Sequence, residues 1–168
     1  MLGLCSCGSS NRVVTTKKKQ GTPTEISKEV YDRTPANKPD DRVAYKIVRK
    51  AKSFEGTRYK YGGTTKRGMD CSGLIYVSFL EEDVPLPRTS RAMSLQGERL
   101  YLKEVTIGDL LFFETNKNKK VINHVGLVVD VSSNGILFIH SSTSRGIIIS
   151  SLSEKYWYNN FVMARRVI

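Results

Sequence analysis

The stretch "NHVGLVVDVSSNGILFIHSS", residues 123–142, decides the fold class. Two runs of β-branched and aromatic residues flank the turn sequence SSNG, which predicts two antiparallel strands joined by a hairpin. The stretch contains both histidines of the chain, His124 and His140, each toward the outer end of its run. Hairpin pairing therefore predicts that the two imidazoles lie toward the same end of a sheet, unless a bulge or a slipped register separates them.

The rest of the chain divides into helical and strand patterns. Residues 109–114, 146–151 and 161–168 are further short strand-like runs separated by turn residues. Upstream, apolar residues recur at helical spacing after Asp41, the expected N-cap, at Val43, Ile47, Val48, Ala51 and Phe54. Residues 71–83 predict a second, central helix. Helices first and strands second predict an α+β fold, with N-terminal helices packed on an antiparallel β-sheet.

Residues 1–42 differ in composition from residues 43–168, which we expect to form one folded domain. Residues 8–41 are rich in Ser, Thr, Lys, Pro and Asp, the composition of a flexible tether. The opening "MLGLCSCGSS" is similar to a bacterial lipoprotein processing site, at which Cys7 becomes the acylated residue and attaches the chain to a membrane. The alternative, a disordered terminus with two incidental cysteines, stays open.

Composition and charge limit the classes of partner. With 39% hydrophobic and 26% charged residues, and no apolar run of about 18 residues, the chain is expected to be soluble and not to span a bilayer. A formal net charge of +11 favours binding to a polyanion, such as nucleic acid, anionic lipid or an acidic cell-wall polymer. The sequence lacks zinc-finger spacing and an RNA-binding signature, so no nucleic-acid partner is expected.

The stretch "GMDCSG", residues 68–73, places Cys71 where the second helical pattern begins. The unpaired N–H groups of a helix N-terminus lower the pKa of a thiol there, and Gly73 leaves room for whatever approaches the sulfur. A small buried thiol is the alternative. A base and its orienting partner, supplied by His124 and His140, favour a thiol enzyme. Zinc held by the same three residues is a weaker alternative, because no local metal-binding pair is present; we expect no metal and no cofactor.

The blocks "GTRYKYGGTTKRGMDCSGLIYVSF", "PLPRTS", "GDLLFF", "NHVGLVV" and "FIHSS" resemble, in that order, the NlpC-type papain-like peptidases that cut bacterial peptidoglycan stem peptides. The resemblance covers about residues 43–168. It implies that Cys71 is the nucleophile, that His124 is the general base and that His140 orients His124.

The resemblance also implies a set of substrate contacts. Tyr59 matches a tyrosine that lines the site and helps to hold the carbonyl oxygen. Asp70, Ser72 and Ser90 match positions that grip the free L-Ala amine of a stem peptide, and Arg88 matches a positive neighbour of that pocket. From the residues alone, Asp70 is equally a helix N-cap, while Tyr59 and Arg88 are also consistent with loop packing and a solvated turn.

The resemblance thus implies a cysteine endopeptidase that hydrolyses the bond between γ-D-Glu and the diamino acid of peptidoglycan stems. We expect a monomer in the bacterial cell envelope, with Cys7 as the candidate site of a lipid anchor. Two alternatives stay open: a papain-like amidase or acyltransferase on another substrate, and a non-catalytic cell-wall-binding module.

Overall fold

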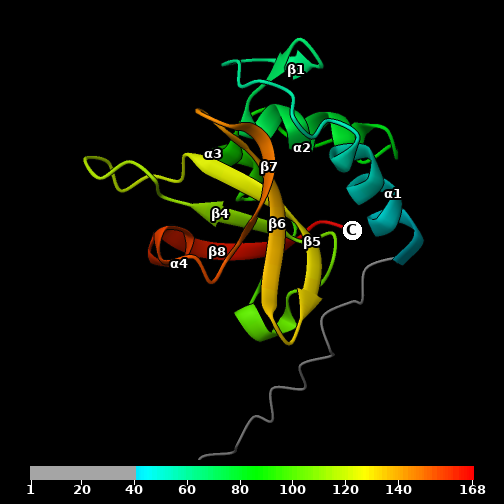
Figure 1. Cartoon of the computed structure of the whole chain (residues 1–168). Coiled ribbons are helices and arrows are strands. Elements are labelled where there is room, and N and C mark those ends of the chain that lie inside the picture. The colour runs from blue at the N-terminus through cyan, green and yellow to red at the C-terminus, as the bar shows by residue number, and fades with distance from the viewer. Residues whose placement is uncertain (1–40) are drawn as a thin grey trace, which may run out of the picture. The chain divides into compact units, whose positions relative to one another are not determined.

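The computed structural model describes residues 41–168. Residues 1–40, which include the predicted lipidation site at Cys7 and all but the last residue of the predicted tether 8–41, lie outside the described residues. The described part of the chain contains the following elements (Figure 1): α1 Asp41–Lys52, β1 Thr64–Thr65, β2 Gly68–Met69, α2 Cys71–Leu80, α3 Ser90–Met93, β3 Glu98–Leu100, the 3₁₀ helix η1 Leu102–Glu104, β4 Leu110–Phe113, β5 His124–Ser132, β6 Gly135–Ser142, β7 Gly146–Ser151, α4 Lys155–Asn160 and β8 Phe161–Arg166.

The main sheet has six strands in the order β3-β8-β4-β5-β6-β7, and every neighbouring pair is antiparallel. All five strands expected from the sequence are present, so the predicted α+β fold is confirmed. Six short elements of two to six residues each were not predicted from the sequence: β1, β2, β3, α3, η1 and α4. Segments this short contain too few residues to display a hydrophobic period.

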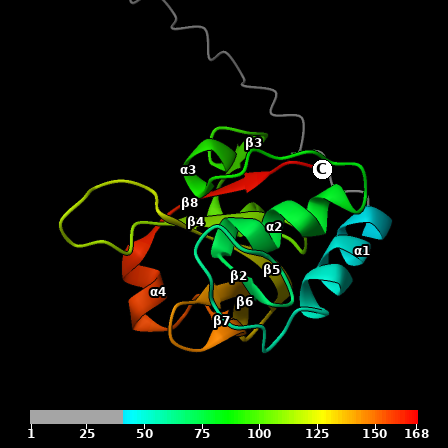
Figure 2. The ribbon, with the colours of Figure 1, turned by 90° about the horizontal axis from the view of Figure 1, so that it is seen from above.

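Both predicted helices are present and lie beside each other near one face of the sheet (Figure 2). The first helix begins at Asp41, the residue expected as its N-cap, and buries Ala44, Ile47, Val48 and Ala51. It ends at Lys52, so Phe54, which the helical spacing included, lies beyond the helix. The second begins at Cys71 but ends at Leu80, three residues before the predicted end, because the chain turns at Glu81–Asp83. In the range 41–168, no helix is long and apolar enough to cross a membrane.

Two hydrophobic clusters fill the two faces of the sheet. Alternate residues of β4 illustrate the division: Leu110 and Phe112 pack with α1 and α2, whereas Leu111 and Phe113 pack with Trp157 of α4. All four β4 side chains are buried. The central strand is therefore covered on both sides.

A bulge interrupts the β5–β6 hairpin. Next to the turn, Ser132 pairs with Gly135, but beyond the irregularity between Val128 and Asp130, Leu127 pairs with Ile139. Beyond the bulge, each residue of β5 is therefore paired with a residue of β6 one position before the one that the register near the turn would give. Because side chains alternate between faces, this shift decides which residues of the two strands share a face.

Candidate active site

Cys71 is the first residue of α2, as the sequence predicts. Asp70 is the N-cap, and its carboxylate accepts a hydrogen bond from the Gly73 N–H at 2.6 Å. Immediately before it, the Met69 carbonyl accepts a hydrogen bond of 2.8 Å from the Ser141 hydroxyl of β6. The segment that carries the thiol is therefore fixed both to its own helix and to strand β6, which contains His140.

A pocket of about 470 Å³ contains both the thiol and one of the histidines. Its wall includes the predicted site residues Tyr59, Cys71 and His124. The remaining lining comes from four segments near the sheet end, and consists of Thr115, Asn123, Ser141, Ser142, Thr143, Ser144, Arg145, Glu154, Tyr156 and Trp157. The fold thus brings together three residues that are up to 65 positions apart in the sequence.

The two histidines form a hydrogen-bonded pair at one end of the sheet, the end at which the hairpin predicted both imidazoles. His124 Nε2 lies 3.2 Å from His140 Nδ1, and His140 Nε2 lies 3.1 Å from the Ser150 hydroxyl of β7. The ring of Trp157 stacks on His124 with 5.3 Å between ring centroids, and meets the His140 ring edge-on at 4.6 Å. His124 is half-buried at the pocket wall, whereas His140 is fully buried behind it.

Both imidazoles are neutral at neutral pH. Burial lowers the pKa of His124 to about 4. Burial, followed by the nearby charges of His124 and Arg145, lowers the pKa of His140 to about 3. A neutral imidazole has one nitrogen with a lone pair, so His124 is able to accept a proton.

The expected low pKa of the Cys71 thiol is contradicted by the structure. Burial raises the pKa of Cys71, and the Asp70 charge raises it further. The backbone N–H groups of Val125, Ser72 and Cys71 lower it, but they do not outweigh the loss of solvation. Cys71 therefore rests as a thiol, and a nearby base is required to form the thiolate.

Tyr59 lies beside the thiol and joins Met69 through an isolated parallel β-bridge. Burial, and then the charges of Cys71 and Asp70, raise the pKa of the Tyr59 phenol above its ordinary value of 10.0. The hydroxyl consequently keeps its proton at neutral pH. It is available as a hydrogen-bond donor at the pocket wall.

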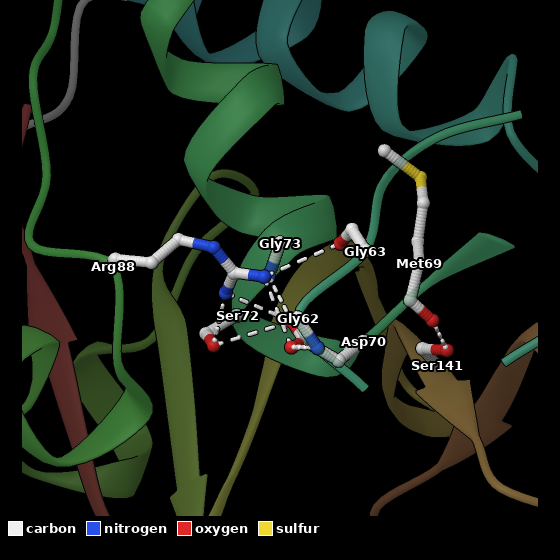
Figure 3. A network of polar contacts seen from close by, with 8 residues as sticks. All are labelled: Gly62, Gly63, Met69, Asp70, Ser72, Gly73, Arg88 and Ser141. Atoms are coloured by element: carbon white, nitrogen blue, oxygen red, sulfur yellow. Dashed lines mark hydrogen bonds and ion pairs between the residues drawn. The ribbon is translucent and has the colours of Figure 1, made fainter. Parts of the chain in front are cut away.

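Asp70 and Arg88 form a closed network at the start of α2 (Figure 3). Each carboxylate oxygen of Asp70 accepts from one guanidinium nitrogen of Arg88 at 2.9 Å, and one oxygen also accepts from the Gly62 N–H at 2.7 Å. Arg88 further donates to the Ser72 hydroxyl at 2.9 Å and to the Gly63 carbonyl. With the bond from the Gly73 N–H, the carboxylate has four close donors, which fills its acceptor capacity.

The predicted substrate contacts therefore fall into two groups. Tyr59 lines the pocket, whereas Asp70, Ser72, Arg88 and Ser90 do not belong to its lining. Ser90 is a buried residue that starts α3, whose N-cap is Thr89.

The absence of a side chain at Gly73 makes room for other parts of the protein, and not for a group that approaches the sulfur as expected. A Cβ atom at this position would collide with the Gly63 carbonyl and come within 3.0 Å of Arg88. The missing side chain thus makes room for the loop that carries Gly63 and for the ion pair.

Sequence reasoning missed two residues that contact the histidine pair, Ser150 and Trp157. The turn "STSRG" contains the signal for Ser150, because Ser142 pairs with Gly146 and the register then places Ser150 opposite Phe138. Counting along this hairpin puts Ser150 on the same face as His140. Trp157 lies on a helix of six residues and gives no such signal.

Within residues 41–168, no group of three or more His, Cys, Asp or Glu side chains is arranged to hold a metal ion. The site is instead a thiol, a bonded histidine pair and a tyrosine around one pocket. The family model described as the NlpC/P60 family matches residues 56–166. The chain belongs to the NlpC/P60 family of cysteine peptidases.

Relatives of this NlpC/P60 chain support the assignment. It is 40% identical over 116 residues to the probable endopeptidase NlpC of Escherichia coli K12, an alignment that covers 68% of the chain and 72% of the relative. It is 35% identical over 127 residues to the murein DD-endopeptidase MepS/murein LD-carboxypeptidase of the same strain, covering 75% of the chain and 64% of that relative. The bifunctional muramidase/DL-endopeptidase CwlT of Bacillus subtilis is 36% identical, with 72% of the chain and 36% of the relative covered.

Solved structures agree with the fold. A Staphylococcus aureus protein described as similar to a lipoprotein of the NLP/P60 family matches with a TM-score of 0.70 and 30% identity, over 80% of this chain and 44% of that one. An NlpC/P60 family protein from Bacillus cereus matches with a TM-score of 0.67 and 28% identity, over 74% of this chain and 40% of that one. This NlpC/P60 chain therefore spans less than half the length of these two structural neighbours.

Proposed function

We propose that this chain is a cysteine endopeptidase that hydrolyses the bond between γ-D-Glu and the diamino acid of peptidoglycan stem peptides. The observation that carries the proposal is a single pocket lined by Cys71 and His124, with His140 bonded to His124 at 3.2 Å behind it. Family membership supports the peptidase reaction, and the names of the relatives support peptidoglycan as the substrate class.

Acylation begins with proton transfer from the Cys71 thiol to His124. The Nε2 atom of His124 faces His140, so the Nδ1 atom is the one left to take the proton. The thiolate attacks the carbonyl carbon, and the resulting oxyanion receives hydrogen bonds from the Cys71 N–H and the Tyr59 hydroxyl. The imidazolium then protonates the leaving amine as the C–N bond breaks, which leaves a thioester on Cys71.

Deacylation uses the same groups in reverse. Neutral His124 removes a proton from a water molecule, which attacks the thioester carbon. The C–S bond breaks, the new carboxylic acid leaves, and the thiolate recovers its proton from His124. His140 stays bonded to Nε2 of His124 throughout and keeps Nδ1 directed at the reacting atoms.

The network at Asp70 bears on which stems are accepted. Its carboxylate accepts four close hydrogen bonds and is 7% exposed, so an incoming ammonium group would have to displace Arg88. We therefore assign Asp70 and Arg88 to holding the start of α2 in place. On this assignment the enzyme does not require an unsubstituted L-Ala amine.

The bond that is cut is best decided by product masses. The relatives are named for DD, LD and DL bonds, and thus support a peptidoglycan peptidase without choosing among the bonds. Purified wall and defined stem peptides should be digested with the wild-type chain and with Cys71→Ala, and the fragments weighed. Fragments with a new γ-D-Glu carboxyl terminus support the proposal; release at another bond identifies a different amidase, and undiminished release by Cys71→Ala rules out the thiol mechanism.

We also propose attachment to the cell envelope through lipid on Cys7, on the basis of the sequence around that residue. Expression of the full chain in bacteria with labelled palmitate tests it. Label that is lost in Cys7→Ala supports the anchor, and equal labelling of both chains opposes it.

A further inference from the structure

Ser150 is a buried residue whose hydroxyl ends the chain of hydrogen bonds that starts at His124. It is 5% exposed on β7, and its hydroxyl lies 3.1 Å from His140 Nε2. His140 Nδ1 in turn lies 3.2 Å from His124 Nε2. The three side chains therefore form one line that runs from the interior to the pocket.

Two proton arrangements satisfy this line when both imidazoles are neutral. In the first, His124 carries its proton on Nε2 and donates it to His140 Nδ1, while His140 donates from Nε2 to the Ser150 hydroxyl. In the second, every bond is reversed: Ser150 donates to His140, and His140 Nδ1 donates to His124 Nε2. The second arrangement puts the only proton of His124 on Nδ1, where it blocks proton transfer from Cys71.

We propose that Ser150 is a positioning residue that accepts a hydrogen bond from His140 and thereby holds His124 in the tautomer that leaves Nδ1 free. This inference rests on the proposed roles of Cys71 and His124. Ser150 is separated from the base His124 by two hydrogen bonds, and it contacts neither the substrate nor the thiol. Without the hydroxyl, the first arrangement leaves a buried N–H of His140 without an acceptor, whereas the second leaves only a lone pair unfilled, which costs less, so the balance moves toward the second.

The same line of hydrogen bonds also serves the step in which His124 is protonated. When His124 takes the proton of the thiol, both of its nitrogens carry hydrogen, and the Nε2 proton still points at the lone pair of His140 Nδ1. Because the Ser150 hydroxyl accepts the Nε2 proton of His140, the Nδ1 atom of His140 keeps its lone pair. No rearrangement of His140 is then needed between the neutral and the protonated base, which lowers the barrier to proton transfer.

The test combines a direct reading of tautomers with kinetics. Long-range ¹H–¹⁵N spectra of the histidine rings at neutral pH, in the full chain, should show the His124 proton on Nε2 in the wild type. In Ser150→Ala, and in the nearly isosteric Ser150→Cys, whose sulfur is a weak acceptor, that signal should move toward Nδ1. On a defined stem peptide, kcat should fall about 10- to 100-fold with KM unchanged, the effect of one buried donor left without an acceptor.

Two controls separate this role from a purely structural one. Ser150→Thr keeps the hydroxyl and should restore the wild-type tautomer and most of kcat. Ser78→Ala removes another fully buried hydroxyl, which donates to the Leu74 carbonyl at 2.8 Å, and should leave the His124 tautomer unchanged.

A wild-type His124 with its proton on Nδ1 overturns the proposal without any variant. So does wild-type kcat in Ser150→Ala or Ser150→Cys. A wild-type chain that shows the Nε2 tautomer but cuts no stem peptide counts against the proposed function alone, because the spectra do not depend on the substrate.

Discussion

His124 and His140 share one face of the sheet because a bulge interrupts the hairpin between them. Near the turn, Val131 pairs with Ile136, and this register carried to the strand ends would place the two histidines on opposite faces. Beyond the bulge, Leu127 pairs with Ile139, which puts both on the same face and within 3.2 Å of each other. The extra residue in β5 thus creates the pair instead of separating it.

Replacing the proposed nucleophile or base should stop catalysis without unfolding the chain. Cys71→Ala should release no stem fragments, and His124→Ala should lower kcat about 100- to 10,000-fold, the usual contribution of a general acid and base. Fragment release from purified wall, followed by chromatography, measures both. Far-ultraviolet circular dichroism should match the wild type, and fragment release by Cys71→Ala at the wild-type rate would exclude Cys71.

The acid limb of the activity should lie far below the ordinary histidine pKa. Burial lowers the pKa of His124 to about 4, so the neutral, proton-accepting form persists as the pH falls through 6.5 and is lost only near 4. The pH profile of kcat/KM for the free enzyme reports this value. Stem peptides with amidated carboxyls provide the control, because they do not titrate in this range. An acid limb near 6.5 for such substrates would contradict a buried neutral base.

The thiol should react slowly with alkylating agents at neutral pH. Since burial raises the pKa of Cys71 above its ordinary value of 9.0, the thiolate accumulates only at higher pH. The rate of iodoacetamide modification, followed by mass spectrometry, should therefore still be rising at pH 9. The urea-unfolded chain is the reference, and a folded-state midpoint below that of the unfolded thiols would show that the helix N-terminus outweighs burial.

The network at Asp70 should matter for stability. Asp70→Ala removes an N-cap and leaves Arg88 without its partner, and should lower the free energy of unfolding by about 2–4 kcal/mol. Arg88→Ala should also destabilise, because it leaves the buried Asp70 carboxylate without its counter-ion, although the Gly62 and Gly73 N–H groups still bind it.

Urea unfolding measures both changes at Asp70 and Arg88. Lys50→Ala breaks an ion pair with Glu81, whose side chain is 54% exposed, and should change the free energy of unfolding by less than about 1 kcal/mol. Equal losses in Asp70→Ala and Lys50→Ala would show that burial of the network adds nothing.

Stems with a blocked amine should be cleaved nearly as well as free stems. Because Asp70 is saturated by protein donors, acetylation of the L-Ala amine should change kcat/KM by less than about tenfold, equivalent to about 1.4 kcal/mol. Paired assays on a free and an acetylated peptide of the same sequence measure the ratio. A loss of a hundredfold or more on acetylation would restore Asp70 as an amine receptor.

Much of this architecture is predictable from local patterns. The helix from Asp41, the helix from Cys71 and the strands from residue 109 onward follow from apolar periods and turn residues, which depend only on near neighbours. Short elements such as α3 and α4 are set by packing against the rest of the chain, and their sequences contain too few residues to indicate them.

The sequence by itself determined the residues that we propose to carry the chemistry, because a cysteine at a helix start and two histidines flanking one turn are local facts. Tertiary structure alone decided how these residues behave. The bulge in β5 set the faces of His124 and His140, and burial reversed the expected shift of the Cys71 pKa. Arg88, which lies 18 positions after Asp70 in the sequence, forms an ion pair with the Asp70 carboxylate. Register, solvation and ion pairing depend on segments that meet only in the folded chain, so no local pattern contains them.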